Sequence, residues 1–352
     1  MPAGRMRWYS ALRTRSSRPR PTTPNDRHPE TSDSLSVYDR PVTTPSTPPP
    51  LPDAPPALGL EREIPLARHT YLRIGGPAAY FGTPPDIRTF IEIWAWAKAQ
   101  AIPLRIIGGG SNMLVADEGV HAVVVSLRRA CGRLEFEGAS VYAGAAVMLP
   151  ALAKAAAERS LGGVEFAIGI PGDIGGAMQT NAGIGDGRSI GDVVASVEVL
   201  RDGKPVTLPR AQVAFDYRHT SLRAAHELVL GATLTLTPRP RGEIEAEMGR
   251  LLAARQATQP TAEPNAGSVF RNPPEGRAGQ MIEEVGGKGI TSGTAHVSSL
   301  HANFIVHDGH ATARQYVEVM TEVQRRVFAT YGVRLIPEIE WWGDGPPPEV
   351  FQ

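Results

Sequence analysis

Residues 169–176 read Gly-Ile-Pro-Gly-Asp-Ile-Gly-Gly, and this stretch decides the fold. It is followed at residues 181–187 by Asn-Ala-Gly-Ile-Gly-Asp-Gly. So many glycines form neither a good helix nor a good strand, but they let backbone N–H groups turn inward and approach a ligand closely. This composition is typical of loops that bind a phosphate or a diphosphate.

An earlier loop offers the same chemistry. Residues 108–112 read Gly-Gly-Gly-Ser-Asn directly after the strand-like residues 104–107. Two such loops predict one long cofactor that is held at more than one point. The common nucleotide motifs are absent, because a Rossmann loop needs a glycine where Met113 stands and a P-loop needs Ser or Thr where Gly289 follows Lys288. Plain glycine-rich turns without a ligand are the alternative.

Composition limits the class of protein. The 352 residues include 36 basic and 36 acidic side chains, so the formal net charge is zero. This balance argues against a nucleic-acid-binding surface and against a polybasic membrane surface. The single cysteine, Cys131, cannot form an internal disulfide, and no apolar run is long enough to span a bilayer. A cytoplasmic protein without membrane insertion is expected, and a monomer is favoured.

The chain divides into a tail and three folded units. Residues 1–58 are rich in Pro, Ser, Thr and Arg and predict a disordered tail, which is either a true appendage or a misassigned start. We expect two α+β subdomains at residues 59–117 and 118–240, with most of the cofactor site in the second. A C-terminal α+β domain at residues 241–343 and a short tail at 344–352 complete the chain.

Local signals predict several elements of the first two units. Asp86 is a typical cap for a helix that ends near Gln100, in which Phe90, Ile91, Trp94 and Ala97 share a face. The Asp202-Gly203 pair predicts a hairpin between strands at residues 193–200 and 205–208. A further strand is expected at residues 228–236. Trp94 and its neighbour Trp96 are interpreted as core residues.

The third unit has equally local signals. Residues 242–259 predict a charged helix, residues 303–307 a strand, and residues 313–331 a helix capped by Thr312 and stopped by Gly332. Residues 333–341 alternate and predict a closing strand that places Ile336, Glu338 and Glu340 on one face.

Three side chains are candidates for chemistry, each with an ordinary alternative. Ser268 lies on a turn after Gly267, although a serine that serves a local turn is favoured from this string alone. Arg218 can hold a carboxylate in a bidentate fork, but most arginines are solvated. Glu338 is a general acid if it is buried and an ordinary strand residue otherwise. A serine hydrolase is disfavoured, because neither Ser268 nor Ser111 lies in Gly-x-Ser-x-Gly.

The histidines of the C-terminal third do not predict a metal. Their spacing fits no His-Glu-x-x-His helix, and no nearby cysteine completes a zinc set. The four residues are His296, His301, His307 and His310.

Taken together and in order, several strings resemble the UDP-N-acetylenolpyruvoylglucosamine reductase family, in its shorter-loop branch. They span residues 60–343, almost the whole folded chain. They are the stretches around Thr70-x-x-Arg73-Ile-Gly-Gly-Pro-Ala78, Gly108-Gly-Gly-Ser-Asn112, Gly169-Ile-Pro-Gly172 with Gly175-Gly176, Asn181-Ala-Gly183, Tyr217-Arg218, Ala266-Gly-Ser-Val-Phe270 with Asn272-Pro273, His301-Ala-Asn-Phe-Ile-Val306, and residues 332–338.

The resemblance implies a fold and a reaction. Two α+β subdomains would share an FAD in the manner of the vanillyl-alcohol-oxidase fold, and the C-terminal domain would bind the substrate. NADPH would reduce the flavin and leave, and the enolpyruvyl ether of UDP-N-acetylglucosamine would then take its place. Hydride addition at C3 and protonation at C2 would give UDP-N-acetylmuramate, a precursor of peptidoglycan, which links the chain to cell-wall biogenesis, cell shape and cell division.

The resemblance also assigns roles to residues. Ser268 would donate the proton, and Arg218 and Glu338 would stabilise the negative charge that builds on the substrate. Tyr217 and Asn272 would contact the substrate. The residues implied in FAD binding are Arg73, Gly108, Gly109, Gly110, Ser111, Asn112, Ile170, Pro171, Gly172, Gly176, Asn181 and Gly183.

The chain departs from the family at three places. His296-Val297-Ser298 stands where a glutamine often precedes Val-Ser, Thr220 stands where a serine often follows the Tyr-Arg pair, and Ile184-Gly185-Asp186 lacks the usual aromatic residue. Two other functions compete with the reductase: an FAD-dependent sugar or alcohol oxidase of the same fold, and a phosphosugar-binding protein that has lost the flavin.

Overall fold

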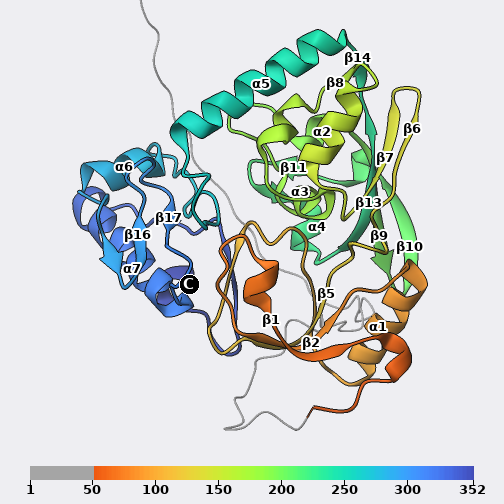
Figure 1. Cartoon of the computed structure of the whole chain (residues 1–352), viewed down its shortest axis with the longest axis horizontal. Helices are drawn as coiled ribbons and strands as arrows, with labels where there is room; N and C mark the ends of the chain where they lie inside the picture. The colour runs from red at the N-terminus through yellow and green to blue at the C-terminus, as the bar shows by residue number, and fades with distance from the viewer. Residues whose placement is uncertain (1–50) are drawn as a thin grey trace, which may run out of the picture. The chain divides into compact units, whose positions relative to one another are not determined.

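The computed structural model describes residues 51–352 (Figure 1). The predicted tail lies outside the described residues as far as residue 50. Its last part, residues 51–58, is packed: the 3-10 helix η1 covers Pro56–Leu58, and Leu58 is buried. Arg62 donates hydrogen bonds to the carbonyl oxygens of Leu51 and Pro52. The packed chain therefore includes residues that we predicted to be part of the tail.

The first sheet has four strands in the order β1-β2-β5-β3. The strands are β1 (Glu61–Pro65), β2 (Pro77–Gly82), β5 (Val120–Val125) and β3 (Leu104–Ile106). β1 runs antiparallel to β2, whereas β2 and β3 both pair with β5 in parallel. The predicted boundary at residue 117 lies before β5, whose partners β2 and β3 come before that boundary.

Helix α1 (Ile87–Ala99) follows the predicted cap. Asp86 accepts a hydrogen bond from the Thr89 N–H at 2.8 Å, which satisfies one free donor of the first turn. Ile93 is buried on the core face, but Ile91, Trp94 and Trp96 are only partly buried and pack against the edge of the core. The helix was predicted correctly. Its buried face contains Ile93 in place of the predicted Ile91 and Trp94.

The second sheet has five antiparallel strands in the order β10-β9-β13-β7-β6. They are β10 (Lys204–Pro209), β9 (Val194–Arg201), β13 (Leu228–Thr235), β7 (Ser140–Gly144) and β6 (Leu134–Glu137). The predicted β9–β10 hairpin is confirmed, and its turn residues Asp202 and Gly203 both have positive φ, at 48° and 73°. This is the combination that a tight hairpin turn requires.

Helices cover this sheet. They are α2 (Leu149–Ala157), α3 (Ile174–Thr180), α4 (Ser221–Ala224) and α5 (Arg241–Thr258), together with the 3-10 helices η3 (Glu165–Gly169), η4 (Ile190–Asp192) and η5 (Arg210–Gln212). Ile244 and Met248 of α5 belong to the same apolar cluster as α2 and β13. Helix α5 therefore packs with the second unit, although the predicted boundary at residue 240 would separate them.

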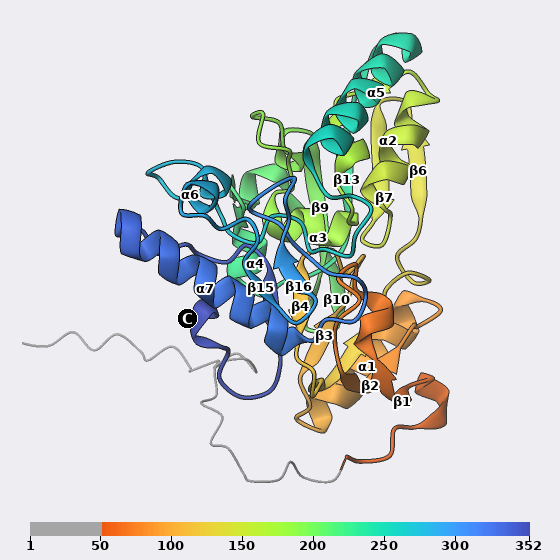
Figure 2. The ribbon, with the colours of Figure 1, turned by 60° about the vertical axis from the view of Figure 1, so that its left-hand side comes forward.

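The third unit is built around α7 (Ala313–Tyr331), which packs on the small sheet β15-β16-β17 (Figure 2). The strands are β15 (Thr291–Ser292), β16 (Ala295–Val297) and β17 (Ile305–Val306), and α6 (Ala278–Glu284) contacts α7. Both predicted ends of α7 are confirmed, since Thr312 forms a capping box with Gln315 and Gly332 has a φ of 67°. The predicted strand at residues 303–307 is shorter.

The prediction of a closing strand at residues 333–341 was wrong over most of its length. The strand β18 is Glu340–Trp342 and pairs in parallel with β4 (Met113–Val115), far away in the sequence. Ile336 is 56% exposed whereas the side chain of Glu338 is 17% exposed, so the two do not share one face of a strand. The conformation of this segment is therefore determined by pairing with a distant strand, and not by the alternation of apolar and polar residues along it.

The remaining elements are short. They are η2 (Leu66–His69), β8 (Leu161–Gly162), β11 (Phe215–Asp216), β12 (His219–Thr220), β14 (Thr237–Pro238) and η6 (Glu349–Phe351). None of the helices within residues 51–352 is both long and apolar enough to cross a membrane.

Candidate active site

The two predicted glycine loops lie against each other. A Cβ atom added to Gly109 would come within 3.4 Å of the Cα atom of Gly172, and one added to Gly172 would come within 3.4 Å of the Ser111 hydroxyl oxygen. The first loop follows β3 of the first sheet, and the second follows the 3-10 helix η3. The expectation that both loops serve one site is consistent with this contact.

A third predicted motif joins them through the backbone. The N–H of Tyr71 donates to the carbonyl oxygen of Gly110 at 2.9 Å. Gly110 has a φ of 64°, and a Cβ there would lie 2.1 Å from the carbonyl oxygen of His69. Only glycine fits such a close approach. Neighbouring Arg73 is exposed and also has a positive φ, at 54°.

These loops fit a phosphate-bearing cofactor. Glycine backbone from both loops meets there, which is the kind of surface that a diphosphate needs in order to reach N–H groups. Ile170, Pro171 and Gly172 are partly buried beside it. The N–H of Gly176, however, already donates to the carboxylate of Asp173 at 3.0 Å.

Asn181, a predicted cofactor-binding residue, makes two hydrogen bonds within the protein. It ends α3 with a φ of 47°, and it is 8% exposed. Its Oδ1 atom accepts from the N–H of Gly191 and its Nδ2 atom donates to the carbonyl oxygen of Asp216, both at 3.0 Å. The side chain thus holds the β11–β12 hairpin. At Gly183, a Cβ would lie 2.3 Å from the carbonyl oxygen of Arg188.

The β11–β12 hairpin presents Arg218 at its turn. Arg218 has a φ of 53°, a strained conformation for a non-glycine residue that is common at functional sites. Its Nε atom lies 2.6 Å from the Oε1 atom of Glu338. Both side chains are mostly buried, with 21% and 17% exposed. The structure therefore brings together two of the three predicted catalytic residues, which are distant in sequence.

Burial dominates the chemistry of Glu338. It raises the pKa of the carboxyl above its ordinary value, although the positive charges of Arg218 and Arg271 lower it in part. The backbone of Glu338 also ties the site to the first glycine loop, because its carbonyl oxygen accepts from the Nδ2 atom of Asn112 at 3.2 Å.

Ser268 lies on the segment next to Glu338. The N–H of Glu338 donates to the carbonyl oxygen of Val269 at 2.8 Å. The turn before Ser268 is closed by Asn265, whose Oδ1 atom accepts from the N–H of Gly267 at 3.0 Å. Within residues 51–352 no hydrogen bond occupies the Ser268 hydroxyl, and the residue is partly exposed. The local-turn alternative thus loses its support.

The two predicted substrate contacts differ in their surroundings. Tyr217 is 59% exposed beside Arg218, and the guanidinium carbon of Arg218 lies 5.5 Å from the centre of its ring. Asn272 accepts from the N–H of Ala278 through its Oδ1 atom at 3.0 Å, so part of its amide supports the start of α6.

Sequence reasoning missed two polar residues of this site. Arg271 follows the Ser-Val-Phe string directly, and its Nε atom is buried without a hydrogen-bond partner in the described part of the chain. Asp173 lies inside the first quoted stretch and is 5% exposed. The only signal in the sequence was their position within motifs that we assigned to other residues.

The histidines stabilise turns. His307 is fully buried, and its Nε2 atom lies 2.7 Å from the carbonyl oxygen of Leu72, while its Nδ1 atom accepts from the N–H of Gly309. The Nδ1 atom of His301 accepts from the N–H of Asn303. Across residues 51–352 no three His, Cys, Asp or Glu side chains gather in a metal-binding group.

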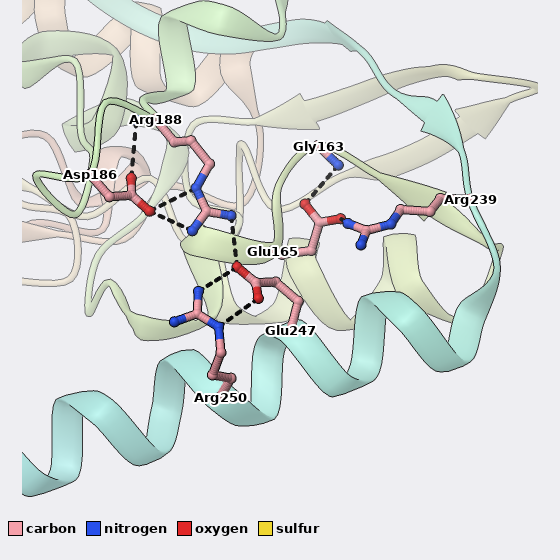
Figure 3. A network of polar contacts seen from close by, with 7 residues as sticks. All are labelled: Gly163, Glu165, Asp186, Arg188, Arg239, Glu247 and Arg250. Atoms are coloured by element: carbon pink, nitrogen blue, oxygen red, sulfur yellow. Dashed lines mark hydrogen bonds and ion pairs between the residues drawn. The ribbon is translucent and has the colours of Figure 1, made fainter.

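The loop after Gly183 is held to α5 by ion pairs (Figure 3). Arg188 pairs with Asp186 in the loop and with Glu247 of α5, whose Oε1 atom is 3.0 Å from the Nη1 atom of Arg188. Glu247 also pairs with Arg250 at 2.8 Å. A second cluster in the same view links Arg239 to Glu165 at 3.0 Å.

Comparisons with known families match both parts of the chain. Residues 259–342 match a model described as the C-terminal domain of UDP-N-acetylenolpyruvoylglucosamine reductase. Residues 78–208 match a model described as an FAD binding domain. The start of the first match supports a boundary near Thr258, at the end of α5.

Individual proteins agree with these matches. The chain is 42% identical to UDP-N-acetylenolpyruvoylglucosamine reductase 2 of Symbiobacterium thermophilum over 288 residues, which cover 82% of this chain and 93% of that protein. It is also 42% identical to the reductase of Moorella thermoacetica, over 80% and 92% of the two chains. The solved structure of the Thermus caldophilus reductase is similar with a TM-score of 0.71 and 34% identity, and covers 81% of this chain and 99% of that one.

Proposed function

The chain belongs to the UDP-N-acetylenolpyruvoylglucosamine reductase family, and we propose that Ser268, Arg218 and Glu338 carry out the family's reaction in it. The protein is an FAD-containing oxidoreductase that reduces the enolpyruvyl ether of UDP-N-acetylglucosamine with NADPH, in the synthesis of peptidoglycan precursors. The observation that best supports the assignment of residues is the buried pair of Arg218 and Glu338, with Nε and Oε1 2.6 Å apart.

FAD would be held where the glycine loops meet. Residues 108–112 and 170–172 offer backbone that approaches closely, and Asn112 connects this backbone to Glu338. When bound, FAD supplies the redox chemistry, since it takes a hydride from NADPH and gives it to the enolpyruvyl group. The polypeptide orients the substrate and handles the charge and the proton.

Arg218 and Glu338 would stabilise the negative charge. Hydride addition at C3 of the enolpyruvyl group builds charge at C2 and on the adjacent carboxylate, where preorganised donors are most effective. The guanidinium of Arg218 attracts that carboxylate. The raised pKa of Glu338 favours its protonated form, which can donate a hydrogen bond.

Ser268 would deliver the proton to C2. Its hydroxyl is partly exposed on the segment that is hydrogen-bonded to Glu338, and within the described residues it is free of other hydrogen bonds. A serine hydroxyl is a weak acid, so it needs a strongly basic carbon as its acceptor. The charge that builds at C2 is such an acceptor.

The variant Ser268→Ala tests this role. It should slow reduction of the enolpyruvyl substrate by about a hundredfold or more, while reduction of the flavin by NADPH changes less than about twofold. Stopped-flow absorbance measures both half-reactions. An equal loss in both would mean that Ser268 is structural. Ser298→Ala, at a buried serine of the same domain, is a control that should leave the ratio of the two rates unchanged.

We also propose revised boundaries and a setting for the protein. The FAD-binding part would divide after Val125, which keeps β5 in its sheet, and the substrate-binding domain would begin after Thr258. The free, buried Cys131 supports a protein of the cytoplasm, and we propose that it is a monomer. Its product would serve cell-wall growth, and hence cell shape and division.

A further inference from the structure

One buried carboxylate lies between the two glycine loops. Asp173 is 5% exposed and caps α3 by accepting the N–H of Gly176 at 3.0 Å. The carboxylate also faces the other loop, where the backbone N–H of Gly109 lowers its pKa and so favours the charged form. Asp173 therefore interacts with both loops at once.

The packing around this carboxylate is tight. A Cβ atom added to Gly108 would lie 2.3 Å from the Oδ2 atom of Asp173 and 2.8 Å from Oδ1. No real Cβ contact is so short, so any side chain at residue 108 would push the loops apart. The carboxylate of Asp173 fits at this place because Gly108 has no side chain.

Asp173 differs from the other aspartate cap of the chain. Asp86 caps α1 with the same bond, at 2.8 Å to the Thr89 N–H, but its carboxylate is exposed and serves one helix only. Burial raises the pKa of Asp173. Backbone N–H groups, including those of Gly109 and Gly176, lower this pKa in part. A cap alone does not require this cost of burying a carboxylate.

We propose that Asp173 is a positioning residue for FAD, which fixes residues 108–112 and 172–176 at the spacing that the diphosphate of the cofactor needs. This inference rests on the proposed function for the identity of the cofactor. The contact between the loops itself belongs to the protein without its cofactor. The two can therefore be tested separately.

The test compares Asp173→Asn with Asp86→Asn. Asparagine caps a helix as well as aspartate does, so both variants should keep their helices. In Asp173→Asn, however, one oxygen becomes an NH2 donor that meets either the Gly109 N–H or the Gly176 N–H, and one favourable interaction is lost. The Kd for FAD, measured by quenching of flavin fluorescence on titration into the apoprotein, should rise about tenfold or more. In Asp86→Asn it should stay within about twofold.

Hydrogen exchange of the apoprotein gives a readout that does not depend on FAD. Peptides that contain residues 108–112 should exchange faster in Asp173→Asn than in the parent, and equally fast in Asp86→Asn. Unchanged exchange together with an unchanged Kd would overturn the proposal. If the parent protein bound no FAD, the proposed function would fail, whereas the exchange difference would still report on the contact between the loops.

Gly108→Ala is the second variant, for the case that Asp173→Asn does not fold. Its added Cβ forces the carboxylate away from the first loop, so the same rise in Kd and the same faster exchange are expected. If Gly108→Ala changes neither the Kd for FAD nor the rate of hydrogen exchange, the proposal is refuted. The contact of 2.3 Å between the added Cβ atom and the Oδ2 atom of Asp173 would then have no consequence.

Discussion

Two glutamates of this protein have similar partners and opposite properties. Glu247, on the surface of α5, pairs with Arg188 and Arg250 at 3.0 and 2.8 Å (Figure 3). These bonds lower the pKa of Glu247 to about 2, the bond from Arg250 contributing most. The carboxylate of Glu247 is therefore always charged under ordinary conditions, and its pairs connect a loop to a helix.

Glu338 also feels two arginines, but its pKa moves the other way. Arg218 lies 2.6 Å away and Arg271 acts through its charge, yet burial outweighs both and raises the pKa. The two side chains have similar exposed fractions, 20% for Glu247 and 17% for Glu338. What differs is the dominant effect on the pKa: hydrogen bonds from arginine for Glu247, and desolvation by the surrounding protein for Glu338. The network of Glu247 is structural, and the pair of Arg218 and Glu338 is available for chemistry.

The largest contrast is expected between Glu338→Gln and Glu247→Gln. The amide of Glu338→Gln still donates a hydrogen bond but has no acidic proton, so reduction of the enolpyruvyl substrate should slow by about 10²-fold or more. The amide at residue 247 breaks two surface ion pairs, which are worth less than about 1 kcal/mol each, and should leave both half-reactions unchanged. Single-turnover absorbance measures the rates. Equal kinetic losses in the two variants would abolish the distinction.

Arg218→Lys should have the next largest effect. An ammonium group cannot reproduce the planar fork of a guanidinium, so the substrate half-reaction should slow by about tenfold to a hundredfold. Arg188→Lys is the matched control, because it changes the corresponding arginine of the exposed network. Normal turnover of Arg218→Lys would remove Arg218 from the mechanism.

The pH dependence of the substrate half-reaction tests the protonation of Glu338. Because its pKa in the folded protein is raised, the protonated form persists above the ordinary range of a glutamate and is lost as the pH rises further. The single-turnover rate should therefore decrease at high pH with a slope of about tenfold per pH unit. Glu338→Gln should lose this dependence. If the rate of Glu338→Gln still decreases at high pH, the titration belongs to another group.

Stability at acid pH tests Glu247. Its pKa is lowered from 4.5 to about 2, so its contribution to stability is complete above about 4.5 and is lost as the pH falls toward 2. The parent and Glu247→Gln should therefore differ slightly in Tm at pH 6 and converge near pH 2 to 3. Since the network is exposed to solvent, the difference should be small. A difference that grows on acidification would contradict the assigned direction.

Deletion of residues 1–50 should have the smallest effect, because it touches neither region. Both half-reactions should keep their rates. Deletion of residues 1–58 is the sharper comparison, since it also removes the buried Leu58 and the carbonyl oxygens of Leu51 and Pro52 that Arg62 contacts. It should lower Tm while the rates are kept. Loss of flavin from the shorter deletion would show that the tail contributes to the cofactor site.

Elements with local causes were predictable from the sequence. Helix α7 was predicted correctly because Thr312 and Gly332 mark its ends, and the β9–β10 hairpin because its turn needs residues such as Asp202 and Gly203. Strand β18 was not predictable, since it forms only where a segment near the end of the chain meets β4 in parallel. Alternation of residue types in one segment carries no information about such a partner.

The site shows the same division. The glycine loops and the Ser268 string were recognisable because their residue types are unusual in themselves. Arg271 and Asp173 were missed because their importance comes from what they meet: a glutamate 67 positions away along the chain in one case, and the Gly109 loop in the other. Asn181 is predicted to bind the cofactor, and in the structure its side chain also contacts the hairpin of Arg218.

The most direct test of the central claim is an anaerobic visible spectrum of the purified protein. It is recorded before and after the addition of NADPH, and again after the enolpyruvyl sugar nucleotide. We expect NADPH to bleach the flavin and the sugar nucleotide to restore the oxidised spectrum without oxygen. A flavin that the sugar nucleotide leaves reduced and only air reoxidises would contradict the reductase and indicate an oxidase. A protein without flavin would contradict both.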